Sequence, residues 1–428
     1  DGSVLEADVS SFTPLTEALA REHGPRRGAE EVAALLTRVY GALVAAVDDA
    51  GGSVVEFTGD AVSCCFHGDR DGTRALHCAV AMQAAMAELR SQAAESPSLT
   101  VTVAVGAFRR FSVGDPNLRL LEVLAGPAVD RLVALAPSAA PGEVLVDAGV
   151  ARRLGARLEV AGWRRYGGAT AALVAGLHEP APPVGLAVPE IAPDRARQWI
   201  SADVHERLAD GDEHLIGELR SVVALFAGFG GIDYDADDAR DRLDVYATFV
   251  QRTVDEYGGT LYTIAVDAKG SYVCAGFGAP RAHDDDEIRA AAAALALRSL
   301  PAAAGGVEAG GIGLARGRLY AGLYGGRTRR TFGLQGTPMN LAARLMQSAG
   351  PGQIVVDEPL ARSLEQRTEL RSLPPLLVKG RVGTVAAREL VGARQPAPAA
   401  AAAAPPHLVN RDRERAVIEA RLRSLGDS

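Results

Sequence analysis

The first hundred residues alternate between short apolar strands and helices with apolar positions at helical spacing. VLEADV (residues 4–9) predicts a strand. Thr13 and Pro14 follow as an N-cap residue and a first-turn proline. Apolar side chains then recur every three or four residues from Val32 to Val47, and Gly51-Gly52 ends the helix that they predict.

A hairpin pattern comes next, in SVVEFTGDAVSCCF (residues 53–66), with Gly59-Asp60 at its tip. We expect a helix over about 71–93 and then a strand in LTVTVAVGA (99–107). Strand, helix, hairpin, helix and strand in this order are the βαββαβ plan of a ferredoxin-like sheet.

The same pattern returns about 207–210 residues later. GGSVVEFTGDAV begins at 51 and GGTLYTIAVDAK at 258, an offset of 258 − 51 = 207; PGEVLVDAGVARRL begins at 141 and PGQIVVDEPLARSL at 351, an offset of 351 − 141 = 210. Two nearly equal offsets indicate one architecture used twice. We therefore expect an α/β (α+β) fold with two ferredoxin-like domains on mainly antiparallel sheets, at 1–179 and 216–392.

Two connecting segments differ in composition from the repeats. Residues 180–215 are rich in proline and charge and predict an ordered linker with a short helix. Residues 393–406 form an Ala/Pro low-complexity tether. Residues 407–428 look like an amphipathic helix that starts a truncated further region, and the chain itself reads as a fragment cut close to its first strand.

Composition limits the partners. The net charge of −8 over 428 residues argues against broad attraction to nucleic acid or anionic lipid. No apolar run reaches the roughly 18–20 residues of a membrane span, and no signal peptide is present. The four cysteines, which lack CxxC spacing, read as reduced and buried: Cys64, Cys65, Cys78 and Cys274. We expect a cytoplasmic protein without membrane or nucleic-acid partners.

Two acidic residues of the first copy stand where a ferredoxin-like sheet brings a strand end beside a hairpin tip. Asp8 ends the first strand and Asp60 lies in the hairpin turn. Each acid alone is equally well explained as a cap or turn residue. Facing each other they repel, which raises a pKa or requires a cation between them. Hard oxygen ligands with room for substrate phosphates suit Mg²⁺.

The second copy has the opposite composition. Its first strand, SVVALFAGFGG, has no acid at its end. TFGLQGTPMNLAARLM (331–346) instead carries Asn340 and Arg344, four apart on one helical face, where the first copy has Asp130 and Ala134. The copies therefore carry complementary halves of one candidate site.

These motifs resemble the tandem catalytic domains of a class III nucleotidyl cyclase of the bacterial, soluble adenylyl cyclase type. The resemblance covers 1–392 and rests on ADVSSFTPLTE, FTGDAV, VDAKGSYVCAGFGAP, FGLQGTPMNLAARLM and PGQIVV. It implies two domains paired head to tail about a pseudo-twofold axis, with one active site between them that converts ATP to 3′,5′-cyclic AMP and pyrophosphate. Residues 407–428 resemble the entry to the ATPase domain that often follows, so further ATPase and helical-repeat regions are expected outside this chain.

The resemblance also implies residue roles. Asp8 and Asp60, helped by the Val9 carbonyl, would hold two Mg²⁺ or Mn²⁺ ions, with Ca²⁺ as an alternative at one site. Asn340 would orient the ribose, and Arg344 would stabilise charge on the α-phosphate. The remaining contacts to substrate phosphates would come from Ser10, Ser11, Phe12, Thr13, Lys379 and Arg381.

Base recognition is where the sequence departs from the family. Thr263 and Gly333 stand where adenylyl cyclases have side chains that recognise adenine. Selection of the base would then depend on backbone groups near Leu334 and on the shape of the pocket. Glu56 stands where a lysine serves bicarbonate response, so we expect no direct bicarbonate activation. Two alternatives stay open: a weakly active or inactive nucleotide- or anion-sensing module that regulates a downstream ATPase, and guanylyl cyclase activity.

Overall fold

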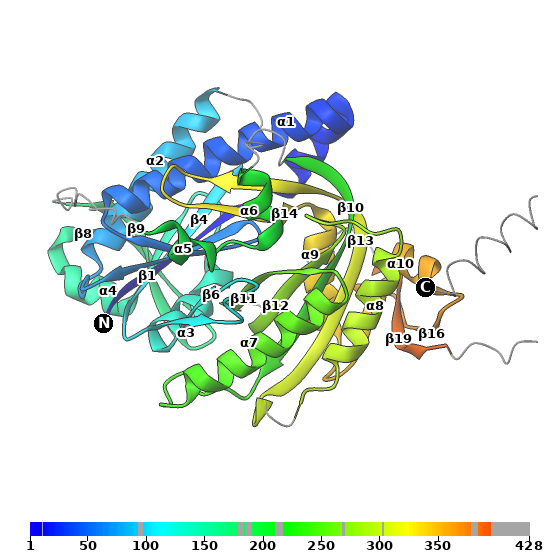
Figure 1. Ribbon diagram of the computed structural model, residues 1–428. Helices are drawn as coiled ribbons and strands as arrows, with labels where there is room; N and C mark the ends of the chain where they lie inside the picture. Colours follow the sequence, from blue (N-terminus) through cyan, green and yellow to red (C-terminus); the bar gives the residue numbers. More distant parts are fainter. Residues whose placement is uncertain are drawn as a thin grey trace, which may run out of the picture.

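The structure is a computed structural model, and it describes residues 1–10, 12–92, 97–178, 184, 191–209, 217–267, 270–301, 304–377 and 384–394. Two β-sheets lie side by side, with the first half of the chain (residues 1–178) blue to teal and the second half (217–394) green to orange in Figure 1. None of the helices described is both long enough and apolar enough to cross a lipid bilayer.

The first sheet has seven strands in the order β2-β3-β1-β4-β7-β9-β8. All neighbours are antiparallel except β4 and β7. Its strands are β1 (Gly2–Ser10), β2 (Ser53–Thr58), β3 (Ala61–His67), β4 (Ser98–Gly106), β7 (Val144–Asp147), β8 (Leu158–Tyr166) and β9 (Ala169–Leu177).

The second sheet repeats this order as β11-β12-β10-β13-β15-β19-β16, with β14 paired to β13. Its one parallel pair, β13 and β15, matches β4 and β7. Its strands are β10 (Glu218–Gly230), β11 (Thr260–Asp267), β12 (Gly270–Phe277), β13 (Glu308–Gly325), β14 (Arg330–Gln335), β15 (Ile354–Asp357), β16 (Thr368–Ser372) and β19 (Ala387–Ala393). A separate short pair is formed by β17 (Leu376–Leu377) and β18 (Thr384–Val385). The repeated plan confirms the expected mixed fold with mainly antiparallel sheets.

Helices cover both faces of each sheet, because alternate strand residues bury their side chains on opposite faces. Leu5 and Cys64 face the core under two long helices, while Val4 and Cys65 face a smaller core under a third helix. The adjacent cysteines thus point to opposite faces, as the strand pattern predicts. The helices of the first half are α1 (Phe12–Asp49), α2 (Thr73–Gln92), α3 (Pro127–Leu135) and α4 (Ala148–Leu154); those of the second half are α7 (Ala239–Glu256), α8 (Asp286–Leu297), α9 (Thr337–Ser348) and α10 (Glu358–Leu364).

Helix α1 spans the range between the predicted start signal at Thr13-Pro14 and the predicted end at Gly51-Gly52, and it contains a kink. It runs over 38 residues, but Gly24 has φ 75° and ψ −176°, so two helical stretches meet at a kink there. A positive φ costs glycine little, which explains why the kink falls at this residue. The helix predicted over 71–93 corresponds to α2 and the hairpin predicted over 53–66 to β2 and β3.

Each half sends a β-arm into the core of the other, and we call these segments the exchanged arms. In the first half the arm is the hairpin β5 (Arg109–Val113) and β6 (Leu121–Ala125), whose Phe111 and Val123 belong to the core of the second half. In the second half the arm is the end of β13 with β14, and Tyr320 and Tyr324 belong to the core of the first half. Both cores are therefore completed by residues from the other half of the chain.

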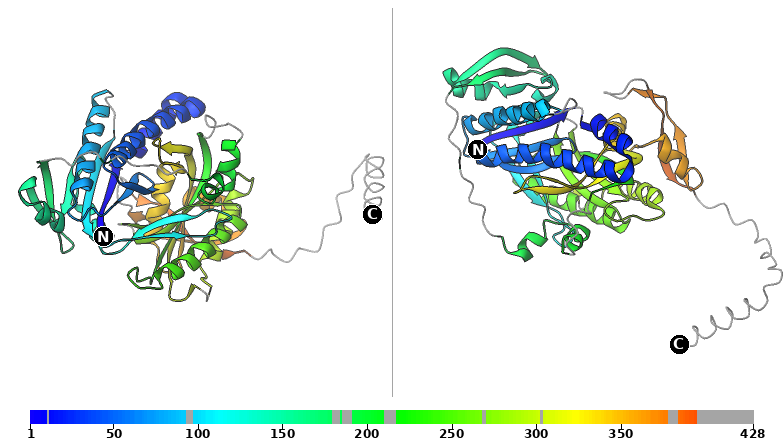
Figure 2. Two further views of the ribbon diagram at one scale, coloured as in Figure 1. Left: turned by 60° about the vertical axis from the view of Figure 1, so that its left-hand side comes forward. Right: turned by 90° about the horizontal axis from the view of Figure 1, so that it is seen from above.

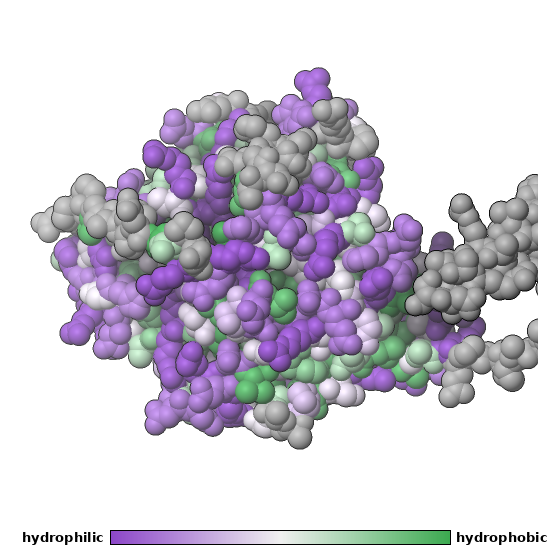
Figure 3. Space-filling view, in the orientation of Figure 1, coloured by the Kyte–Doolittle hydropathy of each residue, from purple (hydrophilic) through white to green (hydrophobic). Residues whose placement is uncertain are grey.

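The segment between the halves is also attached to both. It contains α5 (Pro193–Arg197) and α6 (Ala202–Ala209). The Leu120 amide of the first half donates to the Gln198 carbonyl at 2.6 Å, and Asp203 on α6 pairs with Arg281 of the second half at 3.0 Å. Figure 2 shows both helices against the body of the molecule, and Figure 3 shows a mostly hydrophilic surface with scattered small apolar areas.

Candidate functional site

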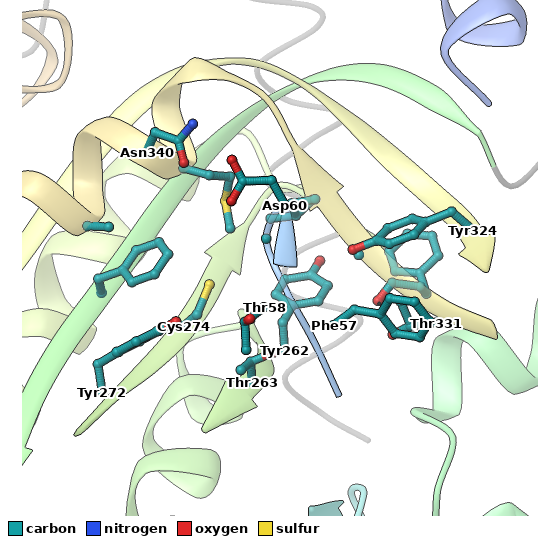
Figure 4. Close-up of a pocket in the computed structure, with 17 residues that line it drawn as sticks. Phe57, Thr58, Asp60, Tyr262, Thr263, Tyr272, Cys274, Tyr324, Thr331 and Asn340 are labelled. Atoms are coloured by element: carbon teal, nitrogen blue, oxygen red, sulfur yellow. Dashed lines mark hydrogen bonds between the residues drawn. The ribbon is translucent and has the colours of Figure 1, made fainter. Parts of the chain in front are cut away.

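A pocket with about 570 Å³ of space, its open mouth included, lies where the two halves meet. Residues of β2 and its turn form one side, and residues of the second half form the rest (Figure 4). Six of its 17 lining residues are aromatic: Phe57, Phe226, Tyr262, Tyr272, Tyr324 and Phe332. Flat rings on several sides of a narrow pocket suit a planar ligand, because aromatic rings stack on one another favourably.

Strand alternation aims these rings inward. Tyr272 and Cys274 are two apart on β12 and therefore share a face of the sheet. Both tyrosines of β11 and β12 are anchored by their hydroxyls: Tyr262 donates to the Ala279 carbonyl at 2.6 Å, and Tyr272 donates to Asp267 at 2.7 Å. Burial raises the pKa of both phenols, so they stay neutral and act as fixed walls.

The β2–β3 turn, which carries Asp60, is held from three directions. The Val9 amide donates to the Asp60 carbonyl at 3.0 Å. The Gly59 carbonyl accepts from the Tyr40 hydroxyl of α1 at 3.3 Å and from the Gln335 amide of β14 at 2.5 Å. Gly59 has φ 69°, a conformation that suits glycine in a tight turn. The second half thus helps to fix an acidic turn of the first half.

Asp8 and Asp60 lie close to one another, as the sheet plan predicts. Asp8 is exposed and pairs in register with Ala61, the residue after Asp60. Both carboxylates act on the same phenol: the pKa of Tyr40 is raised by burial first, then by Tyr324 and by both aspartates. Two neighbouring carboxylates form an oxygen donor set that fits Mg²⁺ or Mn²⁺ when a ligand's phosphates complete the shell. No cluster of three or more His, Cys, Asp or Glu side chains suited to a metal occurs within the part of the chain that the structure describes.

Asn340 and Arg344 of α9 are separated by the structure. Asn340 lines the pocket, and Figure 4 shows its amide at the same end as the Asp60 carboxylate. Arg344 does not line it and instead donates to Gln347 at 2.8 Å. Four residues along a helix share a face, but that face is wide enough for one side chain to enter a pocket and the other to stay outside.

The three residues expected near a base all line the pocket. Thr263 lies on β11, and Gly333 and Leu334 lie on β14. A Cβ at Gly333 would lie 2.6 Å from the Tyr324 hydroxyl oxygen, so a larger residue has no room there. The absence of a side chain at this position widens the pocket beside the Tyr324 ring.

The predicted phosphate contacts are only partly described. Ser10 is the last residue of β1, and Phe12 and Thr13 form the first turn of α1, so the backbone of this segment does enter a helix. Helix N-termini favour anions, since their first N–H groups lack partners within the helix. Ser11, Lys379 and Arg381 lie outside the described residues.

Several pocket residues carry no signal that a motif search would find. Phe226, Tyr262 and Tyr324 sit in ordinary strand patterns, where aromatic residues usually mean core. The alternation of Tyr272 and Cys274 on one strand face is the one local signal that points to a common surface. These side chains meet only because of how the two halves pack, and no single segment of the sequence predicts that packing.

Comparison with known proteins identifies a solved structure with the same fold. The chain matches no protein-family model and no curated protein sequence. Among solved structures, a class III adenylyl cyclase-like ATP-binding protein from Pseudomonas aeruginosa matches 85% of this chain and 84% of its own, with 13% identity and a TM-score of 0.58. The two proteins share a fold.

Shorter matches cover less than half of the chain. The adenylyl cyclase CyaB from P. aeruginosa matches 42% of this chain and 97% of its own, with 21% identity and a TM-score of 0.37. The guanylyl cyclase Cya2 matches 42% of this chain and 96% of its own, with 23% identity and a TM-score of 0.36.

Proposed function

We propose that this chain is a nucleotidyl cyclase that converts ATP to 3′,5′-cyclic AMP and pyrophosphate at the pocket between its halves. One observation supports this most: Asp60 of the first half and Asn340 of the second line the same aromatic pocket. A carboxylate and an amide at one end of a flat aromatic cavity suit a ligand with a planar base and a charged, hydroxylated tail.

The residues have separable roles in this proposal. The aromatic rings and Thr263 hold the base, and Asn340 orients the ribose by hydrogen bonding. Asp8 and Asp60, with the Val9 carbonyl, hold two Mg²⁺ or Mn²⁺ ions, with Ca²⁺ as an alternative at one site. When bound, such ions supply positive charge that stabilises a triphosphate and favours ionisation of a ribose hydroxyl. The backbone of Ser10–Thr13 binds phosphate oxygens at the start of α1.

Arg344 needs a different side-chain conformation to act. Its guanidinium is half-buried and bonded to Gln347, so a swing toward the pocket would exchange one modest hydrogen bond for contact with a phosphate. In the proposed reaction this contact stabilises charge that develops on the α-phosphate. Lys379 and Arg381 are proposed to close on the phosphates from the segment before β18.

A second candidate function is nucleotide binding without turnover. Arg344 outside the pocket favours it, and the protein that shares the fold over most of the chain is described as ATP-binding and cyclase-like. Cyclic GMP formation is the third candidate, because the described pocket has no charged side chain beside Thr263, Gly333 and Leu334 to select a base. Partners further along the full protein, including an ATPase region after residue 407, are part of the same proposal.

One assay separates the three functions. The chain is incubated with Mn²⁺ and either ATP or GTP, and cyclic nucleotide is measured by mass spectrometry alongside nucleotide binding by calorimetry. Cyclic AMP from ATP supports the proposal, cyclic GMP supports the third candidate, and binding without product supports the second. Neither binding nor product would refute all three.

Variants assign the product to this pocket. Asp60→Asn should remove turnover while the melting temperature changes little, because the Asp60 backbone contact to Val9 is kept. Asp237→Asn, in the exposed loop before α7, is the matched control and should turn over like the parent. Full activity in Asp60→Asn would contradict the metal role of this carboxylate.

A further inference from the structure

Tyr262 of the pocket wall lies at an irregular point of its strand. In the pairing of β11 with β12, Leu261 lies opposite Ala275 and Thr263 lies opposite Cys274, so Tyr262 is an extra residue without a partner in the ladder. A bulge of this kind re-aims a side chain, because the regular alternation of the strand is interrupted there. The direction of the Tyr262 ring therefore has to be set by other contacts.

Two cavities adjoin this ring. Tyr262 lines the pocket of Figure 4, and it also lines a second cavity of about 510 Å³, its mouth included. The second cavity is lined as well by Arg119, Arg329 and Trp199, the last of which belongs to the connecting segment. Space beside the ring leaves it room to turn, whereas the hydrogen bond from its hydroxyl to the Ala279 carbonyl ties its far end to the backbone at 2.6 Å.

The backbone that provides this anchor is itself held by helix α6. Residues 279–281 are consecutive, and the two that follow the anchoring carbonyl both contact α6. The Pro280 carbonyl accepts a hydrogen bond from Arg207 at 3.1 Å. The Arg281 side chain pairs with Asp203 at 3.0 Å. The Tyr262 hydroxyl and the α6 side chains are therefore bound to three successive residues of one segment.

Helical spacing explains how α6 makes both kinds of contact. Asp203 and Arg207 are four residues apart and share one side of the helix. The neighbouring side is apolar and packs in the same hydrophobic cluster as Tyr262; it consists of Ile200, Val204 and Leu208. Val204 is 5% exposed, so this side of α6 is fixed against the outside of the pocket wall.

The segment 279–281 keeps partners when the α6 contacts are removed. The Pro280 carbonyl also accepts from Arg220 of β10 at 2.7 Å, and Arg281 also pairs with Asp255 of α7 at 3.2 Å. The ion pair between Arg281 and α6 is partly exposed, so it contributes little to stability. Loss of the α6 contacts should therefore leave the fold intact and give the segment more freedom to move.

We infer that Asp203 and Arg207 are positioning residues of the nucleotide pocket, because they hold residues 279–281 and thereby fix the Tyr262 ring against the base. This inference rests on the proposed function, since it requires a nucleotide in that pocket. Aromatic stacking depends on the relative placement of the two rings. The connecting segment thus takes part in recognition of the base, and its removal from the contact should weaken binding of the base without affecting the phosphates.

Two probes separate the base from the phosphates. 3′-Deoxy-ATP carries both but lacks the hydroxyl that attacks in the proposed reaction, so it binds without turnover; tripolyphosphate has no base. Their dissociation constants are measured by calorimetry with Mn²⁺ for the parent and for Asp203→Asn/Arg207→Met. We expect binding of 3′-deoxy-ATP to weaken about threefold to tenfold, the size of an aromatic stacking contact, and binding of tripolyphosphate to stay unchanged.

The matched control is Glu206→Gln, which changes an exposed acid of the same helix and should bind both probes like the parent. A second background tests the route of the effect. Tyr262→Phe keeps the ring but removes the hydroxyl that donates to Ala279. In this background the double variant should cause no further loss, because both changes act through one contact.

Three results would overturn the inference. One is unchanged binding of 3′-deoxy-ATP in the double variant. Another is equal weakening of 3′-deoxy-ATP and tripolyphosphate, which a general disturbance of the fold would produce. The third is a loss of the same size with and without the Tyr262 hydroxyl. If the double variant fails to fold, Asp203→Asn alone leaves the Arg207 contact in place and should show the same pattern at smaller size.

Hydrogen exchange distinguishes failure of this inference from failure of the proposed function. A parent protein that binds neither 3′-deoxy-ATP nor 3′-deoxy-GTP would refute the proposed function. The role of α6 is then judged from amide exchange in peptides that cover residues 259–281, which should be faster in the double variant than in Glu206→Gln. Equal exchange in these two proteins would show that α6 does not hold the segment.

Discussion

Gln335 connects the exchanged arm of the second half to the acidic turn of the first, and its removal tests that connection. Its side chain is 5% exposed, and its amide donates to the Gly59 carbonyl at 2.5 Å and to the Tyr324 hydroxyl at 3.2 Å. Methionine has nearly the same length and fills the space but donates no hydrogen bond. Gln335→Met therefore leaves the half-buried Gly59 carbonyl and the buried Tyr324 hydroxyl without this donor, at almost constant volume.

The expected cost follows from those two bonds. An acceptor left unsatisfied in a buried place costs about 1–3 kcal/mol, and the Gly59 carbonyl keeps only the long bond from Tyr40. We expect a loss of about 2 kcal/mol, which lowers the melting temperature by at most about 4 °C because the two interdependent halves unfold as one large unit. Nucleotide affinity should fall as well, because Asp60 is then held less firmly.

Differential scanning calorimetry of Gln335→Met and the parent measures this change. Gln347→Met is the matched control, since Gln347 is an exposed residue of α9 and its substitution should change stability by less than about 0.5 kcal/mol. A Gln335→Met protein that melts with the parent would refute the reasoning, and so would a control that loses as much.

Three further predictions concern separate parts of the fold. Burial raises the pKa of Cys65 to about 11, and all four cysteines are buried and free. A disulfide reagent at pH 8 should therefore label the native protein slowly, and it should label four thiols in urea. Fast labelling of the native protein would contradict this burial. Burial opposes ionisation of Asp71, but hydrogen bonds from Arg157 and Thr73 outweigh it and lower the pKa of this carboxyl to about 2. The difference in unfolding free energy between the parent and Asp71→Asn should therefore be constant above about pH 4 and shrink as the pH falls toward 2. A difference independent of pH would count against the ion pair. Gly333→Ala brings a Cβ within 2.6 Å of the Tyr324 hydroxyl oxygen and should lower the free energy of unfolding, measured with denaturant, by about 1–3 kcal/mol. The same substitution should cost less in a Tyr324→Phe background. Equal costs in both backgrounds would rule out this contact.

The sequence predicts those parts of the fold that depend on local periodicity. Apolar spacing places the helix over 32–47, and the Gly59-Asp60 turn fixes the hairpin on either side of it. The repeat offsets predict that both halves share one plan, and the two sheets do have the same strand order. The convergence of Asp60 and Asn340 on one pocket also follows from complementary losses in the two copies.

Other features depend on packing between segments far apart in sequence. The β5–β6 hairpin looks like an ordinary surface hairpin, yet Phe111 and Val123 complete the core of the other half. The position of Arg344 depends on a choice between side-chain conformations that i,i+4 spacing does not determine. Arg119 and Arg329 lie 329 − 119 = 210 residues apart in the sequence, and they line one cavity only because both arms are in place.

The exchanged arms make the two halves interdependent. Separating them would uncover Tyr324 in one interior and Phe111 in the other, so neither half offers a finished hydrophobic interior of its own. A duplicated chain built in this way can lose acids from one copy and amides from the other and still require both. The two copies can therefore carry different site residues without becoming separable, because truncating either copy removes part of the hydrophobic interior of the other.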